Sequence, residues 1–191
     1  MLLSVCGEEN NTAVIPSANA KEASHVLGMD IYPVSSLQEL VTQINNYTLS
    51  PAPKQQEKVN FEQFPYAEDF DSVCGQEGAK RAMEIAAAGG HNLLMVGPPG
   101  SGKTMLAKRL PSILPPLTYN EAIEITKIYS AAGEIDSNRG IVTTRPFRSP
   151  HHTISEVALV GGGRIPKPGE ISLAHNGVLF LVELPQFKKD A

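Results

Sequence analysis

The sequence has only two cysteines, Cys6 and Cys74, among its 191 residues. They lie far apart in unlike contexts, which argues against a disulfide framework and for a reducing compartment. No stretch approaches the roughly 20 apolar residues that a membrane span needs. The first residues also lack the basic segment and the long apolar run of a signal peptide. We therefore predict a cytoplasmic protein that does not enter a membrane.

Extremes of composition are absent as well. Hydrophobic residues make up 41% of the chain and charged residues 19%, which is ordinary for a globular protein and excludes disordered and collagen-like classes. The net charge is −4. Acidic side chains predominate before residue 75 and basic side chains after it. This asymmetry permits contact with polyanions in the second part of the chain but identifies none.

Changes in pattern divide the chain into three segments. Residues 12–49 alternate short apolar runs, at 12–16 and 31–34, with helical patterns over about 19–27 and after an N-cap at Ser36. So few elements cannot cover a parallel sheet on both faces, so residues 1–49 are predicted to be the end of a larger domain. Prolines and polar residues at 50–68 predict a linker, and 69–191 is the second domain.

The second domain is predicted to be α/β. The pattern indicates helices over 76–88, 103–113 and 120–132, strands over 91–96 and 178–182, and irregular structure over 133–176. Alternation of buried strands and helices is typical of a three-layer arrangement, with helices on both faces of a mostly parallel sheet.

A glycine-rich turn joins the strand at 91–96 to the helix at 103–113. Backbone N–H groups in such a turn, and the N-terminal end of the following helix, bind phosphate oxygens. A plain Gly/Pro turn is the alternative, but the flanking strand and helix favour a site for ATP or ADP with Mg²⁺. The residues match G-x-x-x-x-G-K-[ST] in full: Gly97, Pro98, Pro99, Gly100, Ser101, Gly102, Lys103 and Thr104.

Two side chains of this turn have defined expected roles. Lys103 is expected to neutralise the β- and γ-phosphates, and the hydroxyl of Thr104 to ligate Mg²⁺. In ATPases of this class a second strand ends in an Asp that holds the Mg²⁺ shell, and a Glu follows it. Here Val182 occupies the place of the Asp and Glu183 follows. Because an isopropyl group accepts no hydrogen bond, we expect nucleotide binding with weak or no hydrolysis. A capping or solvated surface role for Glu183 is the alternative.

Several blocks, in order, resemble the magnesium chelatase-like AAA+ ATPases and, within them, the YifB/ComM branch. These blocks are residues 69–76, the turn at 97–104, and residues 145–155, 161–163 and 168–181. The resemblance covers about residues 12–190 and implies a P-loop NTPase (AAA+) fold for 69–191. Residues 1–49 are similar to the C-terminal end of a Lon-protease-like (ribosomal S5-type) domain.

The resemblance also implies an activity. The family is a hexameric ATP-driven motor acting on DNA, in branch migration during transformation. By this similarity Val73, Gly75 and Gln76 lie near the adenine, residues 97–104 hold phosphate and Mg²⁺, and catalytic Glu183 positions the attacking water. The chain departs from the family at Val182 and at Gln186, where the family has Asp and Glu.

The family's sensor residue, arginine finger and helical lid correspond to positions past Ala191. We therefore expect this chain to be a weak or inactive ATPase. We also expect it to leave apolar strand edges unpaired, so that it is marginally stable, aggregates or pairs with another copy.

A basic segment precedes the last predicted strand. Arg145, Arg148 and Arg164 lie among glycine and proline turns. In the family this region resembles an insertion hairpin facing a central pore, so residues 145–170 are expected to contact DNA phosphates; a solvated loop is the alternative. His151 and His152 lack a supporting Cys or carboxylate cluster, so a loop or interface role is favoured over a metal site.

Three functions stay open at this point. The chain is a module of an ATP-driven DNA motor with weak hydrolysis, or a non-hydrolysing protein in which nucleotide controls assembly, or part of a chelatase-type motor that acts on a protein partner. The intact Lys103 and Thr104 suit all three, and Val182 favours the second for this chain.

Overall fold

The computed structural model describes residues 12–24, 28–53, 66, 68–135 and 140–187. They fall into two compact units, the first drawn from residues 1–59 and 135–141 and the second from 60–134 and 142–191. Each unit has its own hydrophobic cluster. Within the described ranges, no helix combines the length and the apolar character needed to cross a bilayer.

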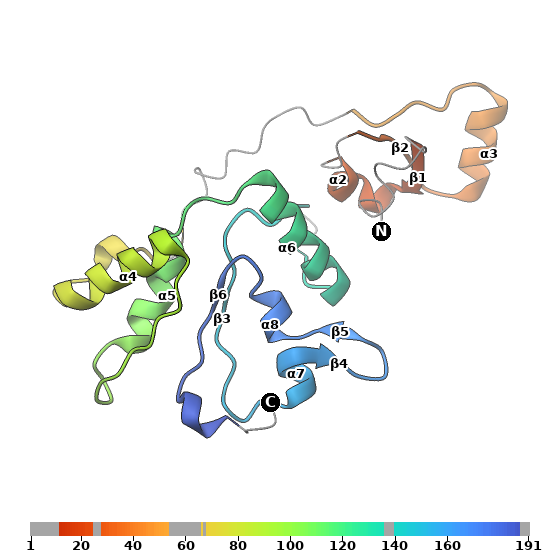
Figure 1. Ribbon diagram of the computed structural model, residues 1–191. Helices are drawn as coiled ribbons and strands as arrows, with labels where there is room; N and C mark the ends of the chain where they lie inside the picture. The colour runs from red at the N-terminus through yellow and green to blue at the C-terminus, as the bar shows by residue number, and fades with distance from the viewer. Residues whose placement is uncertain (1–11, 25–27, 54–65, 67, 136–139, 188–191) are drawn as a thin grey trace. The chain divides into compact units, whose positions relative to one another are not determined.

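The first unit is built on one parallel strand pair (Figure 1). Strand β1 (Thr12–Pro16) pairs with β2 (Asp30–Val34) in unbroken register. The crossover that a parallel pair requires contains η1 (Ser17–Asn19) and α2 (Ala20–Ala23). Both predicted strands are confirmed. The helix expected over 19–27 is described only as far as Ala23, and residues 25–27 lie outside the described part of the chain.

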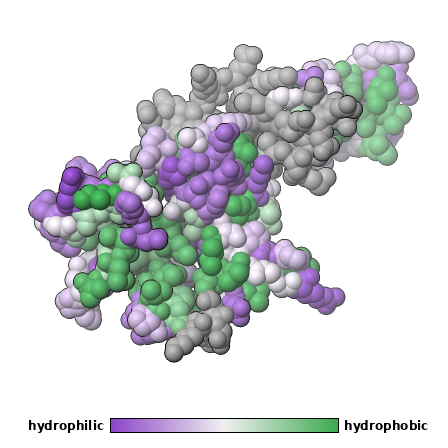
Figure 2. All heavy atoms as spheres, in the orientation of Figure 1, coloured by the Kyte–Doolittle hydropathy of each residue, from purple (hydrophilic) through white to green (hydrophobic). Residues whose placement is uncertain are grey.

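Helix α3 (Leu37–Asn45) begins at the predicted N-cap. Ser36 Oγ accepts a hydrogen bond from Glu39 N at 3.1 Å, and Glu39 Oε2 accepts one from Ser35 N at 2.7 Å. Its apolar stripe reaches the surface, where Figure 2 shows hydrophobic side chains on this helix. Leu37 is 76% exposed, and Val41 and Ile44 are about half exposed.

The second unit contains the longer helices, and all of those predicted from the sequence are confirmed. They are α4 (Glu77–Gly89), α5 (Lys103–Ile113) and α6 (Tyr119–Ala132), preceded by the short η3 (Phe70–Ser72). Helix α4 ends at Gly90, which adopts the left-handed conformation of a C-cap. Helix α6 starts with a capping box between Thr118 and Glu121.

Helices α4 and α5 lie side by side (Figure 1). The buried cluster between them and η3 consists of Phe70, Val73, Met83 and Leu106. Phe70 N also donates a hydrogen bond to Ser112 Oγ on α5, at 3.0 Å. Burial of these large apolar side chains stabilises the packing of α5, and with it the position of the loop that precedes this helix.

The strands of the second unit are short. Strand β3 (Phe147–Arg148) pairs in parallel with β6 (Val178–Leu179), and β4 (Gly161–Gly162) pairs with β5 (Lys167–Pro168) in a hairpin. Helices α7 (Glu156–Val160) and α8 (Glu170–Leu173) flank the hairpin, and η4 (Leu184–Gln186) follows β6. The prediction of irregular structure throughout 133–176 is therefore wrong, since β3, α7, β4, β5 and α8 lie within that range.

The strand predicted over 91–96 does not form a ladder with any described residue. Leu94 is 77% exposed and Val96 is 89% exposed. The run at 178–182 contributes only Val178–Leu179 to a strand. An apolar run becomes a strand only when a neighbour supplies its hydrogen bonds, and the described residues form two-stranded pieces instead of one central sheet.

Candidate nucleotide-binding site

The turn at 97–104 lies between the extended segment 91–96 and the first turn of α5. Gly100 and Gly102 adopt φ values of 77° and 83°, a region that side-chain-bearing residues rarely occupy. A Cβ at Gly97 would lie 3.0 Å from Ser101 Oγ, and one at Gly102 would lie 3.0 Å from Gln76 Nε2. The close approach and the left-handed backbone both explain why glycine occupies these positions.

Lys103 folds back over this turn. Its Nζ donates hydrogen bonds to the carbonyl oxygens of Gly97 at 2.8 Å and Pro98 at 2.9 Å, and lies 3.3 Å from Ser101 Oγ. The ammonium group is thus held at the N-terminal end of α5, where the first N–H groups have no intrahelical partner. Positive charge and free N–H donors at one place favour a bound anion.

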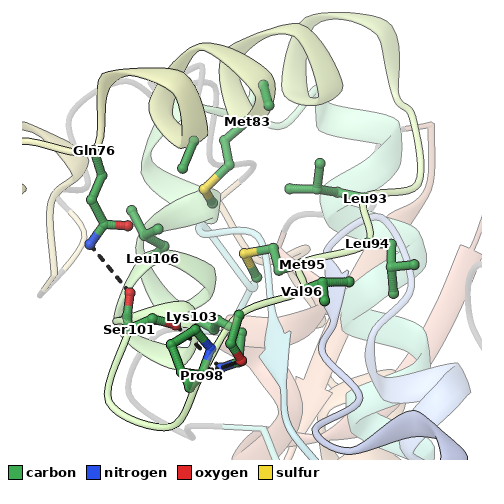
Figure 3. A pocket seen from close by; sticks show the side chains of 13 residues that line it. Gln76, Met83, Leu93, Leu94, Met95, Val96, Pro98, Ser101, Lys103 and Leu106 are labelled. Carbon is green, nitrogen blue, oxygen red and sulfur yellow. Dashed lines mark hydrogen bonds between the residues drawn. The ribbon is translucent and has the colours of Figure 1, made fainter.

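A pocket of about 360 Å³ adjoins the turn. Figure 3 shows Met83 from α4, Met95 from the extended segment and Leu106 from α5 pointing into the same space. The polar side chains on its wall are those of Gln76, Ser101 and Lys103, and Gln76 Nε2 donates to Ser101 O at 3.4 Å. An apolar cavity with a few polar groups at its edge is typical of a small-molecule site.

Gln76 and four residues of the turn line this pocket. The turn contributes Gly97, Pro98, Ser101 and Lys103. Val73 does not line it, because its side chain is buried in the cluster behind, and Gly75 adopts a positive φ in the turn before α4. Thr104 is exposed. The roles assigned to all of these residues remain predictions.

Sequence reasoning missed the apolar wall. Its signal is present on α4, where Ala79, Ala82 and Met83 recur at helical spacing and face the turn. The predicted strand 91–96 supplies the opposite wall through Leu93, Leu94, Met95 and Val96.

Glu183 is not part of the pocket wall. It precedes η4 with a positive φ of 58°, and its carboxylate lies 3.5 Å from Nδ1 of His152. Val182, in the place where an Asp was expected, is 37% exposed. Among the described residues no cluster of three or more His, Cys, Asp or Glu side chains could hold a metal ion.

Two of the arginines expected to contact DNA are engaged within the protein. Arg145 donates to the carbonyl oxygens of Pro115 at 2.6 Å and Asn176 at 2.7 Å, and to Glu121 Oε1 at 3.2 Å. Its side chain is only 10% exposed. We therefore assign Arg145 a structural role, and the expectation that it contacts phosphate is wrong for this conformation.

Arg148 forms the second such network. Its Nε and Nη2 donate to the two carboxylate oxygens of Glu170 at 2.6 and 2.7 Å. The hydrogen bonds from this guanidinium lower the pKa of Glu170, against an opposing effect of burial. The pair connects β3 to α8. Arg164 and Lys167, in contrast, are exposed on the β4–β5 hairpin.

Comparison with known proteins places these features in a family. Residues 69–191 match the family model described as magnesium chelatase, subunit ChlI. The chain belongs to the magnesium chelatase family. Family membership implies the AAA+ P-loop fold.

Individual relatives identify the branch. The chain is 48% identical over 178 residues to competence protein ComM of Haemophilus influenzae, which covers 92% of this chain and 35% of that protein. It is 60% identical over 121 residues to YifB of Salmonella typhimurium, covering 63% and 24%. The resemblance to the YifB/ComM branch is thereby confirmed. The chain spans about a quarter to a third of the length of these relatives.

The Arg148–Glu170 pair gives a stability prediction. Replacing Glu170 by Gln removes the two short ion-pair contacts of a partly buried guanidinium and leaves, among the described residues, only the ion pair of Arg148 with Glu134 at 3.4 Å. We therefore expect the free energy of unfolding at pH 7 to fall by about 2 kcal/mol. The folded-state pKa of Glu170 lies below its ordinary value of 4.5. The contribution of the Glu170 carboxylate to the free energy of unfolding is therefore complete above about pH 4.5. It is lost as the pH falls through the folded-state pKa.

Urea unfolding of the native chain and of Glu170→Gln from pH 7 to pH 3 measures this difference. The matched control is Glu84→Gln, which breaks an exposed pair with Arg81 and should cost less than about 0.5 kcal/mol. A Glu170→Gln deficit that stays constant down to pH 3 would refute the electrostatic explanation.

Proposed function

We propose that residues 69–191 bind ATP with Mg²⁺ through the turn at 97–104 and form the nucleotide-binding part of an AAA+ ATPase module. The observation that carries this proposal is the Lys103 ammonium group, held within a glycine-rich turn at the start of α5 and beside an apolar pocket. Positive charge, unpaired N–H donors and an apolar cavity match the triphosphate and the base of one ligand.

Each part of the site has a role in this proposal. Lys103 exchanges its carbonyl partners for phosphate oxygens, because a charge-assisted hydrogen bond to phosphate is stronger than one to a neutral carbonyl. The apolar wall packs against the base, with Gln76 at its edge, and Val73 and Gly75 shape the segment behind it. Residues Gly97, Pro98, Pro99, Gly100, Ser101 and Gly102 surround the phosphates.

The metal fits this site only in part. Bound Mg²⁺ supplies charge neutralisation at the β- and γ-phosphates. The exposed hydroxyl of Thr104 would ligate it, but Val182 offers no oxygen to its hydration shell. We propose that ATP binds with a weak dependence on Mg²⁺ and that hydrolysis, with Glu183 positioning water, is slow. This combination also supports the alternative that nucleotide occupancy controls assembly without turnover.

The wider machine is proposed from similarity. One relative is named a competence protein, and we propose that the module serves a hexameric motor acting on DNA, with residues 1–49 ending a Lon-protease-like domain and 50–68 as a linker. The β4–β5 hairpin supports a DNA contact, because Arg164 and Lys167 are exposed there whereas Arg145 and Arg148 are not available. The family description as a chelatase subunit keeps a protein partner as the alternative to DNA.

Calorimetric titration with ATP tests nucleotide binding. We expect Lys103→Ala to weaken ATP binding by roughly 10- to 100-fold, because the charge-assisted hydrogen bonds to phosphate are lost. Lys108→Ala is the matched control, since Lys108 lies on the same helix but is half exposed and pairs loosely with Glu68. Equal affinities of the native chain and Lys103→Ala would contradict the proposal.

Val182 predicts an unusual metal dependence. We expect Val182→Asp to increase the gain in ATP affinity on adding Mg²⁺ by about tenfold, because a carboxylate then accepts hydrogen bonds from metal-bound water. Val182→Asn introduces a side chain with the shape of Asp but without its charge. It should give a smaller increase in the gain in ATP affinity on adding Mg²⁺. An unchanged Mg²⁺ effect in Val182→Asp would show that Val182 does not lie beside the metal.

The DNA proposal predicts a salt effect that depends on the hairpin. Binding of a branched DNA should weaken as salt rises, and replacing both Arg164 and Lys167 by Ala should reduce the slope of log affinity against log salt by about 1–2. Arg81→Ala, on an exposed face of α4, should leave the slope unchanged. No measurable DNA binding by the native chain at low salt would favour the protein-partner alternative.

A further inference from the structure

One side chain outside the pocket contacts Glu183. Nδ1 of His152 lies 3.5 Å from Glu183 Oε2, and His152 is 26% exposed. Within the described residues, no other side chain forms an ion pair or hydrogen bond with the Glu183 carboxylate. Sequence reasoning had left His152 with only a loop or interface role.

The contact lies just beyond the β3–β6 pair. Phe147 lies opposite Val178 and Arg148 opposite Leu179. His152 and Glu183 each lie four residues beyond the last of these pairs, on the two segments that leave the ladder. Neighbouring parallel strands lie about 4.8 Å apart, so the pairing brings the two segments that follow close together, and the turns at the ends of these segments contain His152 and Glu183.

Other contacts hold both segments at this place. Phe180 N donates to Arg148 O at 2.8 Å, and the rings of Phe147 and Phe180 stack with centroids 6.1 Å apart. The ring of His152 packs on that of His151 at 4.1 Å, and Nδ1 of His151 lies 2.9 Å from Thr153 Oγ1. The imidazole of His152 is therefore restrained by neighbours on its own segment, which follows β3.

Glu183 is less constrained by its surroundings. Its side chain is 55% exposed and its backbone has a left-handed φ of 58°, which costs about 1 kcal/mol for a residue other than glycine. The turn of η4 holds this backbone, since Gln186 N donates to Glu183 O at 2.8 Å. An exposed carboxylate has several rotamers, and a fixed imidazole beside it selects among them.

We propose that His152 is a positioning residue for Glu183: it holds the carboxylate in the orientation from which Glu183 directs water at the terminal phosphate. This inference rests on the proposed function, because it assigns a role to His152 only if Glu183 acts in hydrolysis. A catalytic group misplaced by even 1 Å loses much of its effect, so the loss of a supporting contact reduces turnover without changing ligand affinity.

Single-turnover hydrolysis, with the chain in excess over ATP, tests the proposal in the native chain and in Val182→Asp. We expect His152→Ala to slow hydrolysis about tenfold with unchanged ATP affinity by calorimetry, and His152→Gln, which keeps a hydrogen-bond donor, to recover part of the rate. His175→Ala is the matched control, because it removes a histidine that pairs with another carboxylate, that of Glu124, and it should change the rate less than about twofold. Thermal melts identify any variant that does not fold. If His152→Ala does not fold, His152→Gln takes its place in the test.

A double-mutant comparison separates positioning from a structural role. In Glu183→Gln, the further change His152→Ala should have no effect on the residual rate, because the group it positions is gone. Independent losses from the two changes, or equal losses from His175→Ala and His152→Ala, would overturn the proposal. If neither parent hydrolyses ATP, the proposal falls together with the hydrolytic part of the proposed function, whereas binding that still depends on Lys103 leaves the nucleotide site standing.

Discussion

The hydrogen bonds between the Lys103 ammonium group and the carbonyl oxygens of Gly97 and Pro98 are the interaction on which the account of this protein depends. They place a positive charge within the turn, at the end of α5 where the helix dipole and free N–H groups also favour an anion. The core formed by Phe70, Met83 and Leu106 fixes α5 against α4, and so it fixes the turn. Packing and electrostatics thus act on the same few residues.

A second constraint is the parallel pairing of β3 with β6. It is short, but it brings together the two segments that follow, where His152 and Glu183 meet. The same region is held from the other side by Arg145 and Arg148, whose ion pairs with Glu121 and Glu170 connect it to α6 and α8. Arg145 and Arg148, which the basic segment suggested as DNA ligands, therefore stabilise the packing of this region. The exposed arginine and lysine side chains of the 145–170 segment are those of Arg164 and Lys167 on the hairpin.

Local signals in the sequence were sufficient for much of this structure. The cap at Ser36 and the glycine-rich turn at 97–104 involve residues a few positions apart, and both form as predicted. The prediction of a strand over 91–96 was wrong, because strand pairing depends on a neighbour distant in the sequence, which the periodicity of the apolar residues does not reveal. The roles of Arg145 and Arg148 were missed for the same reason: the partners of their side chains lie 14–31 residues away along the chain. The apolar wall of the pocket could be read on α4, from the helical spacing of Ala79, Ala82 and Met83.

The central claim is that the turn before α5 holds the triphosphate of a nucleotide. Backbone amide chemical shifts, followed by NMR during titration with ATP and with adenosine, test this most directly, because the amides of Gly100, Gly102, Lys103 and Thr104 report on bound phosphate. We expect large shifts at these four amides with ATP and small ones with adenosine. Unchanged shifts in the turn, or equal responses to the two ligands, would contradict the account.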